Sequence, residues 1–321
     1  MEPQRRPHRI CIFGGTGFVG SHLLTRLTAD RHHLRVVTRN RERHHDLWVL
    51  PSLEMAEANI FDPKSLDEVL EGVDVVINLV GILNERDRGG KGFTRIHVDF
   101  PRRLVDACLS KGIRRLLHMS ALGADAAYGM SHYQRTKGEG ENVAHSAASI
   151  RVTSFRPSVI YGPGDSFFNR FASLLRRTPG IFPLACPQAR YAPVYVGDVA
   201  EAYARAIDNS RTYGQRYDLC GPHVYTLKEL VEFTAQSLGL KRKVVGLNDT
   251  LSRMQAMLLE RMPGKPFSKD NYLSMQRDNV CEGPFPEVFG ITPASVESIV
   301  PTYLGEQDQR AYIARLRSRR R

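Results

Sequence analysis

The sequence has few cysteines, and none of them are close together. Its 321 residues contain five cysteines, an odd number, with no C-x-x-C pair. This pattern argues against a disulfide framework and against a zinc site, and it favours a reducing compartment. The five are Cys11, Cys108, Cys186, Cys220 and Cys281.

Signals for secretion, membrane spanning and nucleic-acid binding are also missing. The N-terminus is polar and lacks the apolar region of a signal peptide, so the predicted location is the cytoplasm. The longest apolar run, Val73 to Leu83, contains Asp74 and Asn78 and is too short to span a bilayer. Because no basic patch is interleaved with aromatic residues, no nucleic-acid partner is expected.

Positive charge is unevenly distributed along the chain. The net charge is +11, and much of it lies in a basic N-terminal arm, residues 1–8, and a basic C-terminal tail, residues 309–321. The tail either keeps the protein soluble or contacts anionic lipid or an acidic partner. Peripheral attachment to the inner face of a membrane is therefore the alternative location.

A glycine-rich turn organises the N-terminal half. Residues 10–13 predict a buried strand, and the amphipathic run 18–27 predicts a helix. Glycines between and within them follow a G-x-x-G-x-x-G spacing, which allows a tight turn, approach of the backbone to a pyrophosphate and close helix packing. The turn therefore predicts a dinucleotide site at the helix N-terminus. Its expected contact residues are Gly14, Thr16, Gly17, Phe18, Val19 and Gly20.

Strands and helices alternate through residue 156, which predicts an α/β fold with a doubly wound parallel (Rossmann) sheet. We expect a dinucleotide-binding core at residues 9–165 and a smaller substrate-side region at 166–308, interleaved with the last core strands. Further strands are expected at residues 34–38, 54–60, 73–81 and 113–120, and helices at 94–111, 197–208, 226–238 and 249–261.

The residues after the second strand bear on the choice of cofactor. A site that prefers NAD usually carries an acidic residue there for the ribose 2′-hydroxyl. Thr38 and Arg39 occupy this place, and Arg43 follows. Because arginine suits the 2′-phosphate, NADP(H) is favoured, with NAD(H) as the alternative. A solvated basic loop would also explain these arginines.

Two other places are expected near the nucleotide. Asp62 precedes Pro63, so it either caps a helix or contacts the adenine side. Val80 and Gly81 end the fourth strand and are expected to lie against the cofactor, because ligands bind beyond the carboxyl ends of such strands.

A serine, a tyrosine and a lysine are the candidate catalytic residues. Tyr133 and Lys137 are four residues apart, and on a helix this spacing places them on one face. An ammonium group beside a phenol stabilises the phenolate, so Tyr133 can exchange a proton with a substrate oxygen while nicotinamide exchanges hydride. Ser120, at the end of the fifth strand, can hydrogen-bond the same oxygen. A surface Tyr/Lys pair is the alternative.

The glycine turn, Ser120, Tyr133 and Lys137 together resemble the short-chain dehydrogenase/reductase superfamily, in its extended or atypical branch. Residues 155–165 resemble the segment that lies along the nicotinamide in this branch, which implies contacts from Pro157 and Val159. The resemblance covers residues 9 to about 240, and residues 194–200 resemble the substrate-side strand and helix start.

Within the branch, residues 120–124, 131–133, 137–141, 278–280 and 299–304 most resemble the nucleotide-binding accessory subunit of respiratory complex I and its bacterial relatives. This resemblance implies NADPH held for structural reasons in the mitochondrial member, and a link to quinone metabolism in bacterial ones.

The sequence departs from the superfamily at His97, where many members have an asparagine that supports the lysine through a water. Either a proton relay runs through His97, or the relay is altered and turnover is slow. The stretch after residue 165 is apolar, which favours either core packing or a hydrophobic pocket. It shows no evident diphosphate-binding set, although Arg176, Arg177 and Arg190 could supply one. Its apolar residues are Phe167, Phe168, Phe171, Leu174, Leu175, Ile181, Phe182 and Leu184.

The sequence therefore predicts an oxidoreductase that transfers hydride at a carbonyl or alcohol of an apolar, quinone-related substrate, with no metal. One alternative is a cofactor-stabilised structural or assembly protein of a respiratory or quinone-synthesising complex. The other is a nucleotide-sugar epimerase or dehydratase. No oligomeric state is predicted.

Overall fold

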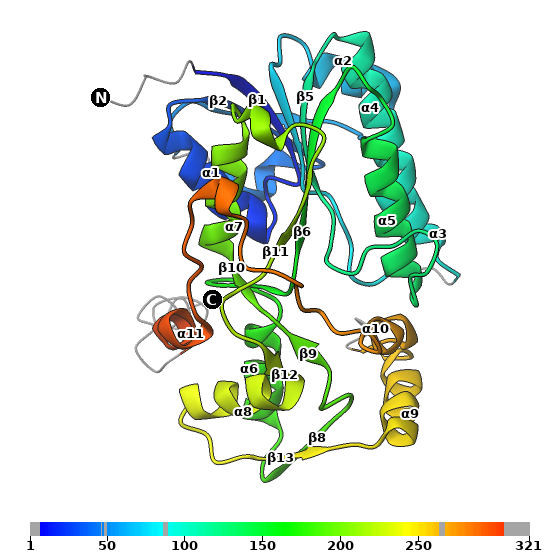
Figure 1. Ribbon diagram of the computed structural model, residues 1–321, viewed down its shortest axis with the longest axis vertical. Helices are drawn as coiled ribbons and strands as arrows, with labels where there is room; N and C mark the ends of the chain where they lie inside the picture. Colours follow the sequence, from blue (N-terminus) through cyan, green and yellow to red (C-terminus); the bar gives the residue numbers. More distant parts are fainter. Residues whose placement is uncertain (1–6, 46, 48–49, 86–88, 263–266, 305–321) are drawn as a thin grey trace. The chain divides into compact units, whose positions relative to one another are not determined.

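The computed structural model describes residues 7–45, 47, 50–85, 89–262 and 267–304. It consists of two compact units, each drawn in Figure 1. Unit 1 comprises Met1–Pro157, Val196–Leu219 and Gly283–Ile291, and unit 2 comprises Ser158–Tyr195, Cys220–Glu282 and Thr292–Arg321. The predicted basic tail and residues 1–6 of the predicted arm lie outside the described residues.

A seven-stranded parallel sheet forms the centre of unit 1, and the predicted doubly wound α/β fold is confirmed. The strand order is β11-β6-β5-β4-β1-β2-β3, so the direction of winding reverses between β1 and β4. In sheets of this kind ligands bind at this reversal, beyond the carboxyl ends of the strands. The strands are β1 (Arg9–Phe13), β2 (His33–Thr38), β3 (Leu53–Glu57), β4 (Val75–Asn78), β5 (Arg115–Met119), β6 (Arg151–Pro157) and β11 (Arg216–Leu219).

Helices cover both faces of this sheet (Figure 1). On one face α1 (Phe18–Ala29) packs against α7 (Val196–Ala206), and on the other α4 (Phe100–Ser110) packs against α2 (Pro63–Val69) and α5 (His132–Ala144). The central strands are therefore buried on both sides, and this explains why β4 consists of Val75, Val76, Ile77 and a single polar residue, Asn78.

The helix expected at residues 94–111 is irregular. It begins as α3 (Lys91–Thr94), continues as a π-helical turn (Arg95–Asp99) and only then becomes α4. Gly140 of α5 lies so close that an added Cβ would overlap the carbonyl oxygen of His97. The π-helical turn thus lies where the backbone of α5 passes close to the backbone at His97, with no side chain of residue 140 between them.

Unit 2 is built from short strands and helices. Three two-stranded sheets pair β7 (Ile160–Tyr161) with β10 (Val194–Tyr195), β9 (Arg190–Tyr191) with β12 (Tyr225–Thr226), and β8 (Ile181–Leu184) with β13 (Lys243–Gly246). The helices are α6 (Phe168–Arg177), α8 (Leu227–Ser237), α9 (Asp249–Leu259), α10 (Lys269–Ser274) and α11 (Val296–Leu304). Core packing explains most of the apolar stretch after residue 165, because Phe168, Leu175, Phe182 and Leu184 are buried in one cluster.

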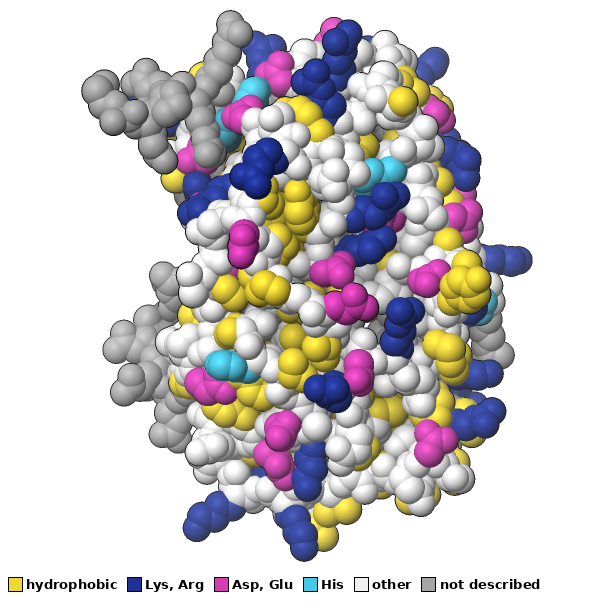
Figure 2. Space-filling view, in the orientation of Figure 1, with side chains coloured by type: hydrophobic (Ala, Val, Ile, Leu, Met, Phe, Trp, Pro, Cys, Tyr) yellow, Lys and Arg dark blue, Asp and Glu magenta, His cyan; other side chains and the backbone are white. Residues whose placement is uncertain are grey.

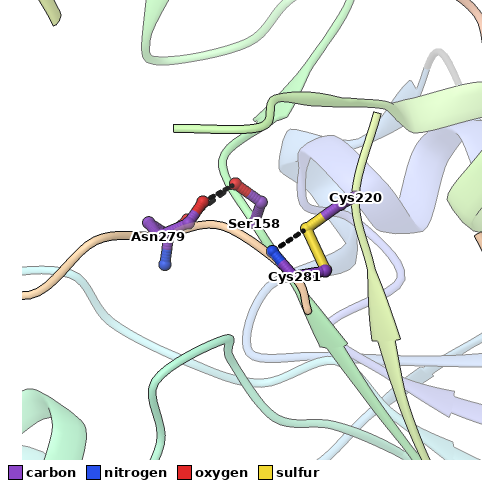
Figure 3. Close-up of a disulfide and its surroundings, with 4 residues drawn as sticks. All are labelled: Ser158, Cys220, Asn279 and Cys281. Carbon is purple, nitrogen blue, oxygen red and sulfur yellow. Dashed lines mark hydrogen bonds between the residues drawn. A yellow bond between two sulfur atoms is a disulfide. The ribbon is translucent and has the colours of Figure 1, made fainter. Parts of the chain in front are cut away.

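Cys220 and Cys281 form a disulfide, so the expectation of no disulfide is wrong for this pair (Figure 3). They are 61 positions apart in the sequence. Tertiary contacts bring them together: Asn279 pairs with Tyr191 of β9 and accepts hydrogen bonds from the Ser158 hydroxyl, and Cys281 follows two residues later. The spacing of the cysteines in the sequence does not predict these contacts. Cys11, Cys108 and Cys186 are free thiols.

The surface carries charges of both signs. In the face that Figure 2 shows, Lys and Arg side chains are interspersed with Asp and Glu. Among the described residues, no helix has both the length and the apolar character that are needed to cross a bilayer.

Candidate active site

The glycine turn lies at the reversal of the strand order, against the end of β4. Gly14 has a φ of +81°, and an added Cβ would lie 3.0 Å from the carbonyl carbon of Leu79. At Gly20 a Cβ would lie 2.5 Å from the carbonyl oxygen of Gly14. Larger residues at either position would push α1 or β4 away, so both glycines are needed for this close packing.

The first turn of α1 is open to an anion. Gly17 is the N-cap residue and supplies no side-chain cap, so the amide groups of the first turn have no side-chain acceptor. Gly17 is exposed, and Thr16, Phe18 and Val19 are half-buried. The predicted nucleotide residues therefore form a cradle of backbone N–H groups that fits a pyrophosphate.

The two arginines that are predicted to bind the 2′-phosphate of NADP follow β2. Arg39 and Arg43 are both exposed, and neither forms an ion pair within the part of the chain that the structure describes. Thr38 accepts a hydrogen bond from the amide of Asn40 over 3.4 Å, which tightens the turn that carries them. Among the described residues, no carboxylate therefore pairs with either of these two guanidinium groups.

Asp62 is a helix cap, as the sequence predicts. Its Oδ2 accepts hydrogen bonds from the Ser65 amide, over 3.1 Å, and from the Ser65 hydroxyl, over 2.6 Å. These bonds hold the pKa of the Asp62 carboxyl below its usual value. Contact of Asp62 with adenine stays a prediction.

Tyr133 and Lys137 share one face of α5, whose start is held by a capping box between Ser131 and Gln134. The ring of Tyr133 packs edge-on against Phe93, at 6.0 Å, and His97, at 5.5 Å. Tyr133 is half-buried, whereas Lys137 is buried.

The ammonium group of Lys137 lies where the ends of β4 and β5 meet. Nζ donates a hydrogen bond to the carbonyl of Met119 over 2.5 Å. A Cβ added to Gly81 would lie 3.8 Å from this Nζ and 3.8 Å from Nε2 of His97. Burial lowers the pKa of Lys137 to about 8. The structure therefore brings Gly81, Tyr133 and Lys137 together at the edge where the glycine turn lies.

Ser120 points toward a carboxylate. It is buried at the end of β5, and its hydroxyl donates to Oε2 of Glu141 over 2.7 Å. The hydroxyl hydrogen is therefore engaged within the protein, and the expected bond from Ser120 to a substrate oxygen stays a prediction.

Glu141 is the residue of this site that sequence reasoning missed. It is 1% exposed, and Nε of Arg156 and Nε of Arg216 lie 2.9 Å and 2.8 Å from its carboxylate oxygens. Its negative charge raises the pKa of Lys137 and so opposes the effect of burial. One signal was available: Tyr133, Lys137 and Glu141 are spaced by four residues, which places all three on one helix face.

His97 holds the π-helical turn in place. Its Nε2 accepts a hydrogen bond from the amide of Ile82 over 3.2 Å, and its Nδ1 lies 3.0 Å from the hydroxyl of Thr136. Thr136 donates its hydroxyl hydrogen to His132, so Nδ1 is the donor and the ring is neutral. Burial and the nearby Lys137 charge lower the pKa of His97 to about 2. The ring is therefore uncharged near neutral pH, with its one proton on Nδ1, and a relay through His97 stays a prediction.

The last two predicted contacts lie at the end of β6. Pro157 is paired with Leu219 of β11, and its carbonyl accepts from the Leu122 amide over 3.0 Å. Val159 belongs to unit 2, where its carbonyl accepts from the Val194 amide over 2.9 Å. Contacts of both residues with a nicotinamide stay predictions.

A Rossmann sheet with a glycine cradle at its reversal and a Tyr/Lys pair beyond β5 defines a dinucleotide-binding protein. Residues 10–220 match the NAD dependent epimerase/dehydratase family, and the chain belongs to this family. The predicted membership of the extended short-chain dehydrogenase/reductase branch is thereby confirmed.

Similarity to known proteins extends over most of the chain. The mitochondrial NADH-ubiquinone oxidoreductase 40 kDa subunit of Neurospora crassa is 25% identical over 95% of this chain and 81% of its own length. A ceramide reductase of Caulobacter vibrioides is 28% identical over 75% of this chain and 74% of its own. The solved dTDP-glucose 4,6-dehydratase of Streptomyces venezuelae, which contains NAD, has a TM-score of 0.72 and 20% identity, covering 92% of this chain and 95% of its own.

Proposed function

We propose that the protein is an NADP(H)-dependent oxidoreductase that exchanges hydride with a carbonyl or alcohol group of an apolar substrate. One observation carries the proposal: Tyr133 and a buried, positively charged Lys137 share the face of α5 that meets the end of β4 beside the glycine turn. A bound nicotinamide would supply the hydride at this edge.

Each residue then has a chemical task. Tyr133 gives a proton to the carbonyl oxygen during reduction, or takes one from the alcohol during oxidation. Lys137 stabilises the phenolate that remains, because its ammonium charge is buried and little screened. Ser120 holds the substrate oxygen or, through Glu141, holds α5. The amides at the start of α1 bind the pyrophosphate, and Arg39 with Arg43 bind the 2′-phosphate.

The proposal of an apolar substrate is based on two relatives of the chain. One is named a ceramide reductase and the other an NADH-ubiquinone oxidoreductase subunit, and ceramide and ubiquinone are both lipids. A carbonyl or hydroxyl group on a long apolar molecule would suit the Tyr/Lys chemistry.

The second candidate is a structural role in a respiratory complex. Similarity to the complex I subunit extends over 95% of the chain, which favours it. In that role a bound cofactor would stabilise the fold by linkage, without turnover. A nucleotide-sugar epimerase or dehydratase is the third candidate, and it has the support of fold similarity alone.

A single-turnover experiment separates these candidates. Protein loaded with NADPH is freed of excess cofactor, and its nicotinamide absorbance is followed after addition of a lipid extract that contains quinones. We expect oxidation of NADPH by the wild type, and a loss of at least about 100-fold in rate in Tyr133→Phe with unchanged cofactor binding. Tyr128→Phe, which changes an exposed tyrosine on the preceding loop, is the matched control.

Two other outcomes would redirect the proposal. NADPH that stays reduced, together with a large rise in melting temperature on cofactor binding, would contradict catalysis and favour the structural role. Tight binding of a nucleotide sugar would favour the third candidate.

A further inference from the structure

Helix α9 in unit 2 exposes an apolar face. Five large side chains between residues 251 and 262 are 45% to 62% exposed, although Ser252 and Ala256 on the other side of the helix are buried. Isolated exposed apolar residues are normal, but a cluster of this kind on one helix marks an interaction surface. We call it the α9 face: Leu251, Met254, Met257 and Leu258 of α9, with Met262, which follows the helix.

A neighbouring sheet of the same unit also exposes apolar side chains. The side-chain amide of Gln255 donates to the carbonyl of Pro183 in β8 over 3.5 Å, which joins α9 to this sheet. β8 pairs with β13, and Ile181 and Val245 of these strands are 60% and 38% exposed. Exposed apolar side chains are therefore present on the sheet that α9 contacts, as well as on α9 itself.

Basic residues accompany this surface. Arg253 in α9, Arg261 just after it and Lys243 in β13 are exposed, and the acidic residues of α9 and its end are Asp249 and Glu260. Asp249 already accepts a hydrogen bond from the Tyr272 hydroxyl over 2.6 Å. In the lower right of Figure 2, the region of α9 in Figure 1, hydrophobic and basic side chains lie side by side.

We propose that the α9 face docks onto the surface of an anionic phospholipid bilayer. An amphipathic helix with apolar side chains on one face and flanking arginines is typical of helices that lie in the membrane interface. The apolar side chains would enter the acyl region, and the long basic side chains would reach the phosphates. Apolar insertion and charge attraction together give more stable anchoring than either does alone. The inference does not depend on the reaction catalysed.

Vesicle co-sedimentation of the full chain tests this docking surface. We expect binding to vesicles of phosphatidylcholine with phosphatidylglycerol, and weaker binding to phosphatidylcholine alone. The double variant Met254→Glu/Leu258→Glu should bind the mixed vesicles at least about tenfold more weakly than the wild type does. Leu109→Glu is the matched control, because Leu109 is an exposed leucine on a helix of unit 1.

A second pair of substitutions keeps the test independent of folding. Arg253→Glu/Arg261→Glu leaves the apolar residues intact and should weaken binding to the anionic vesicles while binding to neutral vesicles stays the same. If both double variants bind mixed vesicles as the wild type does, the basic tail alone carries binding and the proposal fails. It also fails if the wild type forms a dimer without vesicles and Met254→Glu/Leu258→Glu makes it a monomer, because a second copy would then occupy the face.

Discussion

The hydroxyl of Ser120 donates a hydrogen bond to Glu141 over 2.7 Å and so ties the end of β5 to α5. The same carboxylate binds Arg156 of β6 and Arg216 of β11. Because Glu141 lies one helical turn beyond Lys137, this buried charge cluster fixes the helix face that carries Tyr133 and Lys137. Glu141 is therefore a positioning residue, and it also acts on Lys137 through its charge.

Glu141→Gln should change the pH dependence of turnover. In the proposed mechanism the ammonium form of Lys137 is the active one, so the rate should fall as the pH rises through the Lys137 pKa of about 8. Removal of the Glu141 charge lowers this pKa further, so the alkaline fall should move to lower pH, by about one unit. The measurement is a rate profile between pH 6 and 10.

Glu139→Gln is the control for this change, because Glu139 is an exposed carboxylate on the same helix. An alkaline limb at the same pH in Glu141→Gln and wild type would contradict the electrostatic role. A lower melting temperature alone would show only a structural one, since loss of one partner from a buried ion pair is destabilising.

His97 should make the fold sensitive to acid. Its pKa is about 2 in the folded protein, far below the usual value of 6.5, so the unfolded chain binds a proton first as the pH falls. The free energy of unfolding should therefore decrease below pH 6.5, by up to about 1.4 kcal/mol per pH unit from this residue. Denaturant titrations between pH 4 and 8 measure the slope.

His97→Asn should reduce that slope, because asparagine does not titrate while its amide still offers an acceptor and a donor. His118 and His145 also have lowered pKa values because they are buried, so part of the acid sensitivity should remain. An unchanged slope in His97→Asn would mean that His97 is accessible to protons in the folded state.

Arg39 and Arg43 should set the preference for NADPH. The double variant Arg39→Ala/Arg43→Ala should bind NADPH about tenfold more weakly, because charge-assisted bonds to the 2′-phosphate are lost, and should bind NADH unchanged. Calorimetric titration with both cofactors measures the two affinities. Arg41→Ala is the control, because Arg41 lies in the same turn and pairs with Glu42 over 3.5 Å. Equal losses for NADH and NADPH would rule out recognition of the 2′-phosphate.

Reduction of the Cys220–Cys281 disulfide should destabilise unit 2. The bond closes a 61-residue separation, and constraints of this kind contribute about 2–4 kcal/mol to the free energy of unfolding. Cys281→Ser should lower the melting temperature and remove its dependence on a reductant. Cys186→Ser, at a free cysteine of the same unit, should keep that dependence. A wild-type melting temperature that does not respond to reductant would contradict a stabilising role.

Local patterns account for much of unit 1 and for three parts of its site. The glycine spacing, the buried β4 and the i, i+4 relation of Tyr133 and Lys137 all depend on residues close in the sequence, and the structure places them at one edge of the sheet. The π-helical turn was not predictable, because one additional residue in a single helical turn hardly changes the hydrophobic periodicity of the helix.

Local sequence patterns were sufficient to predict the doubly wound sheet, the position of the glycine cradle and the helix face of the Tyr/Lys pair. Each of these follows from backbone conformation and side-chain period within one segment. The hydrogen bond from Ser120 to Glu141, the neutral state of His97 and the pairing of Cys220 with Cys281 became visible in the folded chain and had no signal in the sequence. The physical reason is that burial, pKa and pairing depend on segments that folding brings together from distant parts of the chain.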